Sequence, residues 1–61
     1  MQLLLKKIRL AKGLSVPQLV EITGLSRRTI QDIEKRGDCL LSNAYIISKA
    51  LNVTLNELVE D

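Results

Sequence analysis

Signals that begin helices recur at short intervals along this chain. Ser15 and Thr54 stand three residues before Gln18 and Glu57, which is the spacing of a capping box, where two side chains satisfy amide groups at a helix start. Ser26 precedes a third segment with helical apolar spacing. Helices that start this often must be short, so the pattern predicts a bundle of small helices.

Residues that end helices complete the pattern. Gly13, Gly24 and Asn52 can each adopt the left-handed backbone conformation that closes a helix. Five helices are therefore expected, over about residues 2–12, 16–23, 27–35, 43–51 and 55–59. Ser42 is expected to cap the fourth. No segment has the pattern of a strand, so we predict an all-α fold with a single domain over residues 1–61.

The residue types exclude several classes of site. Cys39 is the only cysteine and histidine is absent, so neither an internal disulfide nor a zinc site built from these residues can form. We expect no metal and no cofactor. A lone thiol suits the reducing cytoplasm, and the longest apolar runs, residues 3–5 and 45–47, are far too short to span a membrane. Cys39 is expected to fill space rather than to sense redox state.

Charge is unevenly distributed along the chain. The net charge is only +2, but residues 1–36 hold eight cations against three carboxylates, whereas residues 37–61 hold one cation against four carboxylates. The first part therefore carries +5 and the second part −3. A basic part favours a polyanionic partner such as nucleic acid, although solvated helix faces alone would produce the same distribution.

The segment Gly24-Leu25-Ser26 has the spacing of a helix-turn-helix. A turn of three or four residues that contains glycine joins the two helices of that motif. Gly24 stands where the backbone of such a turn needs a positive φ, which glycine adopts without steric cost. Because any small bundle has some short turn, this segment alone is weakly specific.

A wider pattern extends through most of the chain. Its residues are Arg9, Gly13-Leu14-Ser15, Leu19, Gly24-Leu25-Ser26, Ile30, Ile33-Glu34 and the tail Ile47-x-x-Ala50-Leu51-Asn52-Val53-x-Leu55-x-x-Leu58. From Ile8 to Leu58 the chain thereby resembles the phage Cro and repressor family, the xenobiotic-response-element type of helix-turn-helix. The resemblance implies a compact five-helix, lambda-repressor-like DNA-binding domain. Its third helix, residues 27–35, would lie in the major groove of double-stranded DNA.

The resemblance also implies roles for individual residues. The expected base contacts are Arg27, Arg28, Asp32 and, as a weaker candidate, Gln31. The expected phosphate contacts are the backbone of Val16 and the residues Lys35, Arg36, Ser42 and Asn43. The forked side chain of arginine suits guanine, and Asp32 either accepts from cytosine or orients Arg28. Two arginines at a helix N-terminus oppose the helix dipole, which favours an anionic partner over a merely solvated face.

Two positions depart from the family pattern. Val20 stands where the family usually has alanine, and a larger side chain there is expected to shift the packing of the second helix against the third. The loop at residues 37–41 is often basic or proline-containing in the family, but here it has neither feature. Phosphate contacts from this loop are therefore in doubt.

Arg9 has two candidate roles. It belongs to the basic part of the chain and would suit a phosphate contact. The family instead pairs this position with that of Glu34, as a salt bridge between the first and third helices. We favour the salt bridge, because a buried pair of this kind is costly to break.

The chain holds more large aliphatic residues than so small a core uses. Leucine, isoleucine and valine together occupy 22 of the 61 positions. Exposed apolar patches mark interfaces, and the family dimerises through its C-terminal end. We therefore predict a homodimer interface at Tyr45, Ile46, Val53 and Leu55. The alternative is that these side chains only cover a small core.

Together these features predict a small transcriptional regulator, a repressor, that binds double-stranded DNA sequence-specifically as a homodimer. The alternative is an antitoxin-like or other interaction module whose main partner is a protein. The apolar fourth helix favours that alternative, whereas the paired arginines do not. We expect no enzyme, because histidine is absent and helix faces and pairing explain the carboxylates Glu21, Asp32 and Glu34.

Overall fold

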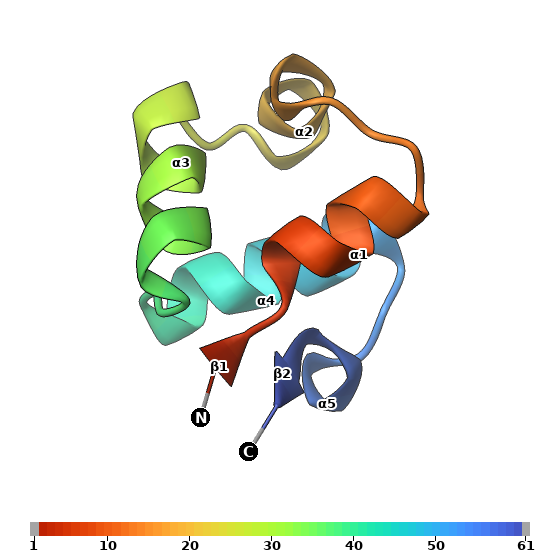
Figure 1. The fold of residues 1–61 in the computed structure, drawn as a ribbon, viewed down its shortest axis with the longest axis vertical. Coiled ribbons are helices and arrows are strands. Elements are labelled where there is room, and N and C mark those ends of the chain that lie inside the picture. Colours follow the sequence, from red (N-terminus) through yellow and green to blue (C-terminus); the bar gives the residue numbers. More distant parts are fainter. Residues whose placement is uncertain (1, 61) are drawn as a thin grey trace.

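Five helices dominate the computed structural model, which describes residues 2–60, so that Met1 and Asp61 of the predicted domain lie outside the described residues. In chain order the elements are β1 (Gln2–Leu3), α1 (Leu5–Ala11), α2 (Val16–Thr23), α3 (Arg27–Arg36), α4 (Leu41–Leu51), α5 (Leu55–Leu58) and β2 (Val59–Glu60). The predicted all-α class is confirmed. In Figure 1, α1 and α4 cross the middle of the fold, α2 lies above them, α3 forms the left edge, and α5 lies below beside both chain ends.

Three of the expected caps hold the starts of helices. Ser15 Oγ accepts a hydrogen bond from the Gln18 amide at 3.2 Å, while Gln18 Oε1 accepts one from the Ser15 amide at 2.8 Å. Thr54 and Glu57 form the same reciprocal pair at the start of α5. Ser26 accepts a bond from a first-turn amide of α3. These local side-chain contacts satisfy amides that a helix start otherwise leaves without partners.

The two ends of the chain differ from the prediction. The first helix begins at Leu5 rather than Gln2, because Gln2 and Leu3 pair as an antiparallel strand with Glu60 and Val59. The last helix accordingly stops just before this strand. The Leu4 N–H donates to the Leu58 carbonyl at 2.7 Å, and the Leu3 N–H donates to the Gly37 carbonyl at the end of α3, at 2.8 Å. Pairings between segments this far apart leave no periodic signal in the sequence.

The start of α4 is a second correction. Leu40 is the N-cap, with extended backbone and no side-chain hydrogen bond, and Ser42 lies inside the first turn instead of capping it. The nearest carboxylate does not replace the missing cap, since Asp38 Oδ1 accepts from the Cys39 amide at 2.8 Å. The helix therefore begins two residues earlier than the serine suggested, without a polar cap.

Every helix contributes to one hydrophobic core. Its buried apolar residues are Leu5, Leu19, Ile30, Ile33, Ala44, Ile47, Leu51 and Leu58. Since the interior is close-packed and each helix supplies at least one of these side chains, no helix can shift without opening a void. The core thus holds α3 in a fixed position at the edge of the fold.

Candidate nucleic-acid interface

The turn between α2 and α3 is fixed by its backbone and by one threonine. Gly24 ends α2 with φ of 75°, in the left-handed region that the sequence predicted for it. Thr23 Oγ1 donates to the Leu19 carbonyl at 2.7 Å and accepts from the Leu25 amide at 3.1 Å. Leu25 is half-buried against the core. This role of Thr23, which joins the turn to the last turn of α2, was not predicted.

The outward face of α3 is polar and mostly cationic. Its inner face buries Ile30 and Ile33. The exposed residues are Arg27, Arg28, Gln31, Asp32, Lys35 and Arg36. All four predicted base-contact residues are thus on one exposed helix face, with the two predicted phosphate contacts at its C-terminal end.

Neither arginine at the start of α3 is neutralised. The first turn of α3 contains no acidic residue. Among the side chains that the structure describes, Arg9 with Glu34 is the only ion pair within 4.0 Å, so Asp32 forms no ion pair with Arg28. A helix N-terminus carries about half a positive charge, and Arg27 and Arg28 add two more beside it. This end of α3 therefore attracts anions.

At the start of α2, one amide remains available. The capping box uses the amides of Ser15 and Gln18, and Pro17 has no N–H. Val16 is therefore the first-turn residue whose N–H still lacks an acceptor within the described residues, while its side chain packs against the core. The predicted backbone contact at Val16 fits an anion at this position.

At the start of α4, the amides are uncapped. Ser42 is exposed and Asn43 is half-buried, both within the first turn. Because Leu40 offers no polar side chain, the early N–H groups of α4 lack a side-chain acceptor. Figure 1 shows this end of α4 beside the C-terminal end of α3, where Lys35 and Arg36 lie. The predicted phosphate contacts of the two helices are therefore neighbours in space.

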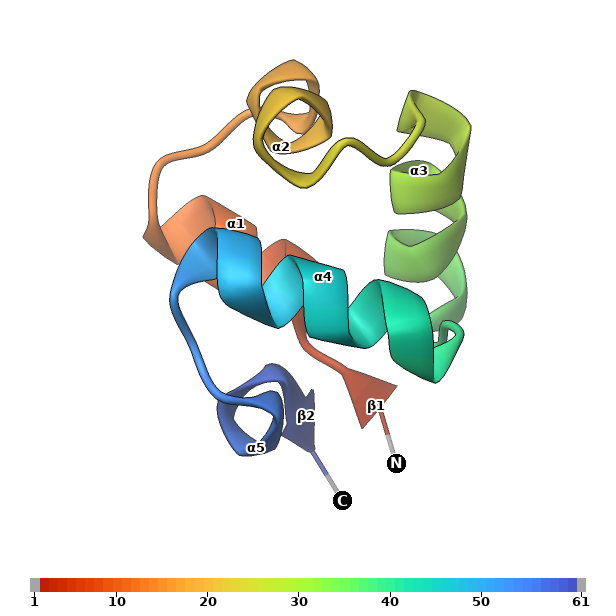
Figure 2. The ribbon, with the colours of Figure 1, turned by 180° about the vertical axis from the view of Figure 1, so that it is seen from behind.

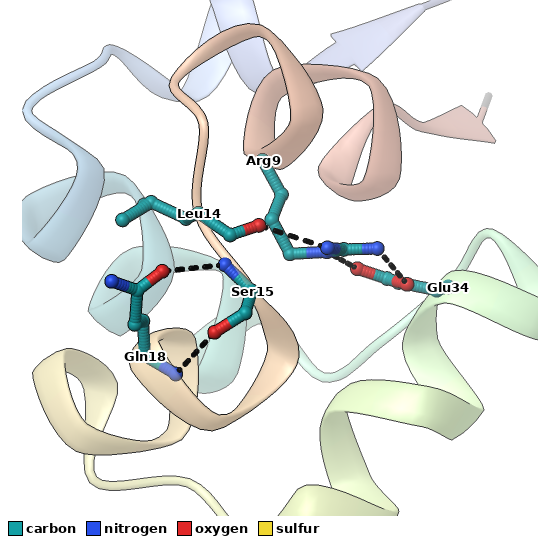
Figure 3. A network of polar contacts seen from close by, with 5 residues as sticks. All are labelled: Arg9, Leu14, Ser15, Gln18 and Glu34. Atoms are coloured by element: carbon teal, nitrogen blue, oxygen red, sulfur yellow. Dashed lines mark hydrogen bonds and ion pairs between the residues drawn. The ribbon is translucent and has the colours of Figure 1, made fainter.

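A buried ion pair anchors α3 from its inner side (Figure 3). Arg9 Nε lies 2.7 Å from Glu34 Oε2, and a second guanidinium nitrogen lies 3.3 Å from Oε1. The third nitrogen donates to the Leu14 carbonyl at 2.9 Å. Arg9 is only 9% exposed, so its guanidinium is engaged inside the fold. The pair with Glu34 is the predicted one, whereas the bond to Leu14 was not predicted and extends the anchor to the α1–α2 loop.

The two departures from the family pattern are accommodated locally. Val20 is half-buried and packs against the core, so the larger side chain fits between the helices. The 37–41 loop carries an acidic side chain at Asp38 and an exposed leucine at Leu40, and it has no cation. Cys39 is half-buried against the core, and burial, together with the nearby Asp38 carboxylate, raises the pKa of its thiol. A protonated thiol in such a place behaves as a small apolar side chain.

The four predicted dimer residues occupy different environments. Tyr45 is 53% exposed, and Ile46 and Leu55 are each 38% exposed. Val53 instead is half-buried and packs against the core. Lys49 Nζ lies 5.3 Å from the centre of the Tyr45 ring, a cation–π distance. Three of the four side chains are therefore available for contact with another molecule.

Two other kinds of feature, metal-ligating clusters and membrane-spanning helices, are absent from the described residues. Between residues 2 and 60, no group of three or more His, Cys, Asp or Glu side chains is placed to hold a metal ion. Over the same range, no helix combines the length and the apolar character that crossing a membrane requires.

Comparison with known proteins agrees with this geometry. No curated protein and no solved structure matches the chain significantly. A family model described as helix-turn-helix, of the Cro/C1 type, matches residues 5–58, which is most of the chain. The matched segment begins with α1 and ends with α5, so it contains the whole helical core, the α2–α3 turn and the cationic face of α3. The chain therefore belongs to the Cro/C1-type helix-turn-helix family of DNA-binding regulators.

Proposed function

We propose that the chain is a repressor that binds double-stranded DNA sequence-specifically, with α3 in the major groove. Arg27 and Arg28 would contact base edges, since the arginine fork matches O6 and N7 of guanine. Asp32 and Gln31, one turn further along the same exposed face, would contact neighbouring bases. Contacts of this kind specify sequence, whereas contacts to phosphate only position the protein.

Around this face, phosphate contacts would come from three places. The free amide of Val16 at the start of α2 is one, and the uncapped turn at Ser42 and Asn43 is another. Lys35 and Arg36 at the end of α3 supply the third. In the proposed complex, a duplex seated on α3 would contact all three.

One observation carries the proposal. Arg27 and Arg28 are exposed at the positive end of α3 with no carboxylate in the first turn and no ion pair among the described side chains. This arrangement is unfavourable in the isolated protein, because the helix dipole repels both cations. It becomes favourable when an anionic ligand such as DNA is seated there.

A second copy would supply a second α3. In a two-fold dimer, two recognition helices meet half-sites about 34 Å apart on one face of the duplex. The predicted interface residues Tyr45, Ile46 and Leu55 are exposed, as such a role requires. Repression would follow if the bound dimer blocks access of polymerase to a promoter.

The apolar surface of α4 supports a second candidate function. Leu40, at the N-cap, and Leu41, in the first turn, are 71% and 76% exposed. Large apolar side chains exposed side by side are typical of an interaction surface. An interaction module whose main partner is another protein would use such a surface. In that case the DNA titration described next would show no binding that depends on salt.

The test begins with selection of bound sequences from a random DNA pool, followed by titration of two variants at several salt concentrations. We expect Arg28→Ala to cost about 1–3 kcal/mol on the selected site and to relax preference at one base pair. Lys35→Ala, on the same helix, should weaken all sequences alike and reduce the salt slope by about one. Equal losses on selected and random DNA for Arg28→Ala would contradict base readout.

A further inference from the structure

The short strand β1 contacts the C-terminal end of α3. The Leu3 N–H donates to the carbonyl of Gly37, the residue that ends α3, at 2.8 Å. The strand also pairs with β2, and the Leu4 N–H beside it donates to the Leu58 carbonyl. Figure 1 and Figure 2 view the fold from opposite sides, and in both β1 lies near the lower end of α3 and the start of α4. The strand therefore connects the end of α3 to the C-terminal part of the chain.

Gly37 lets β1 approach this closely because it has no side chain. It is buried, with φ of 70°, in the left-handed region that glycine adopts without strain. A Cβ at this position would lie 3.0 Å from Cγ of Gln2 and 3.4 Å from its Nε2, which is tighter than ordinary van der Waals contact. The Gly37 N–H donates to the Ile33 carbonyl at 2.8 Å. Both backbone polar groups of Gly37 are therefore engaged, one within the helix and one by β1.

The last turn of α3 extends beyond the residues that the core and the buried ion pair hold. Core packing and the Arg9–Glu34 pair fix the helix as far as Glu34. The side chains of Lys35 and Arg36, which follow, are exposed. The final carbonyls of a helix have no partners within it, so a helix end without outside contacts frays. The bond from Leu3 restrains this end of α3 from outside the helix.

This end of α3 carries proposed phosphate contacts, so the next step rests on the proposed function. Lys35 and Arg36 stand immediately before Gly37, and the uncapped start of α4 follows the loop after it. Arg27, at the other end of α3, lies about 15 Å away along the helix axis. A restraint at Gly37 therefore acts on contacts to phosphate and not on base readout.

We propose that β1 is a positioning element for DNA binding, which acts through its bond to Gly37 and holds Lys35 and Arg36 where both meet the phosphate backbone. A cation on a fraying helix end must lose conformational freedom when it binds phosphate, whereas a cation on a restrained end has already lost part of it. The strand thereby raises the affinity for every DNA sequence alike. It adds nothing to the choice of sequence, because phosphate contacts position the protein and base contacts specify.

Two backbone analogues test this role with matched chemistry. Chemical synthesis of the full chain can place the α-hydroxy acid analogue of leucine at position 3, which replaces the Leu3 N–H by an oxygen and removes its bond to Gly37. The same analogue at position 4 removes the bond from the Leu4 N–H to the Leu58 carbonyl, which is 2.7 Å long. Each analogue keeps every side chain and loses one hydrogen bond, but only the first frees the end of α3. Thermal unfolding checks that both fold.

DNA titration at several salt concentrations gives the main readout. We expect the position-3 analogue to bind selected and random DNA alike about three- to tenfold more weakly at about 0.1 M salt. Its salt slope should fall by about one, because on average one phosphate contact at the end of α3 is lost. The base preference selected from a random pool should stay that of the wild type. The position-4 analogue should match the wild type in affinity and in slope.

Hydrogen exchange of the wild-type chain gives a second readout that needs no analogue. Linkage is reciprocal, so a Leu3–Gly37 bond that favours DNA binding is itself favoured by bound DNA. The Leu3 amide should therefore exchange more slowly when random duplex DNA is added. The Leu4 amide is the internal control, and its exchange should slow by a smaller factor.

The outcomes separate this role of β1 from DNA binding itself. Equal salt slopes for the two analogues, or equal responses of the Leu3 and Leu4 amides to DNA, would overturn the proposal. If the wild-type chain binds DNA with a salt-dependent affinity and the analogues behave alike, the role of β1 fails alone. A wild-type chain without salt-dependent DNA binding would overturn the proposed function and this inference together.

Discussion

The two longest helices, α3 and α4, differ in what their outer faces carry. Both bury aliphatic side chains, Ile30 and Ile33 from α3 and Ile47 and Leu51 from α4. Outside, α3 exposes a row of charged and amide groups, whereas α4 exposes leucine, tyrosine and isoleucine beside one serine and one lysine. Core packing by the inner faces fixes the positions of both helices. Their outer faces differ in chemistry and would therefore bind different kinds of partner.

The starts of the two helices also differ. Ser26 caps α3, although two cations follow at the positive end of the helix. The start of α4 has neither a polar cap nor a charge in its first turn. Both helix starts are therefore destabilised, α3 by two cations at its positive end and α4 by amides without a side-chain acceptor. An anionic ligand would neutralise the cations at the first and accept hydrogen bonds from the amides at the second.

The largest expected effect concerns the ion pair that anchors α3 but has no counterpart on α4. Glu34→Ala leaves the Arg9 guanidinium buried without its carboxylate, so the free energy of unfolding should fall by about 3–5 kcal/mol. Urea unfolding measures this loss. Glu21→Ala, which removes an exposed carboxylate of α2, is the control and should change little. Similar unfolding midpoints for the two variants would mean that the pair does not anchor α3.

A smaller effect compares the two helix starts directly. Ser26→Ala removes the side-chain acceptor of α3 and should cost about 0.5–2 kcal/mol of stability. Leu40→Ser introduces such an acceptor at the start of α4 and should stabilise the chain by up to a similar amount. Both changes are measured by thermal and chemical unfolding at the same pH. If Leu40→Ser gives no gain, the amides of α4 already have partners.

The smallest effect isolates the cost of the arginines. Arg27→Ala should raise the free energy of unfolding by about 0.3–1 kcal/mol at low ionic strength, because a cation leaves the positive end of α3. Lys35→Ala is the matched control and should lower the free energy of unfolding. Lys35 lies in the last turn of α3, where a cation interacts favourably with the helix dipole. Added salt should shrink both differences. Loss of stability in Arg27→Ala would show that the arginine makes favourable contacts in the free protein.

Features that rest on neighbouring residues were predictable from the sequence. The capping boxes at Ser15 and Thr54, the left-handed Gly24 and Asn52, and the helices between them all follow from local backbone chemistry. The cationic face of α3 follows as well, because helical spacing places Ile30 and Ile33 on the side opposite Arg28 and Lys35. The resemblance to the family added the Arg9–Glu34 pair, which no local rule contains.

Features that rest on distant residues were not predictable. The serine at position 42 had the right chemistry for a cap, but the chain enters α4 earlier, at Leu40, where the loop after Gly37 meets the core. The strand pair and the Leu14 bond of Arg9 likewise join groups that only the folded chain brings together. Of the predicted interface residues, only the three-dimensional arrangement separates Leu55, which lines an apolar groove with Leu41, from Ile46, which does not.

By itself, then, the sequence determined where α2, α3 and α5 begin, where α2 and α4 end, which faces are apolar, and that two arginines follow the Gly24 turn, because each of these depends on contacts within a few residues. The tertiary structure alone decided how the chain ends pair, which amides of α2 and α4 remain without acceptors, and where an apolar groove opens beside Leu41. Those outcomes depend on close packing among all five helices, which sets positions in space that no short segment of the chain encodes.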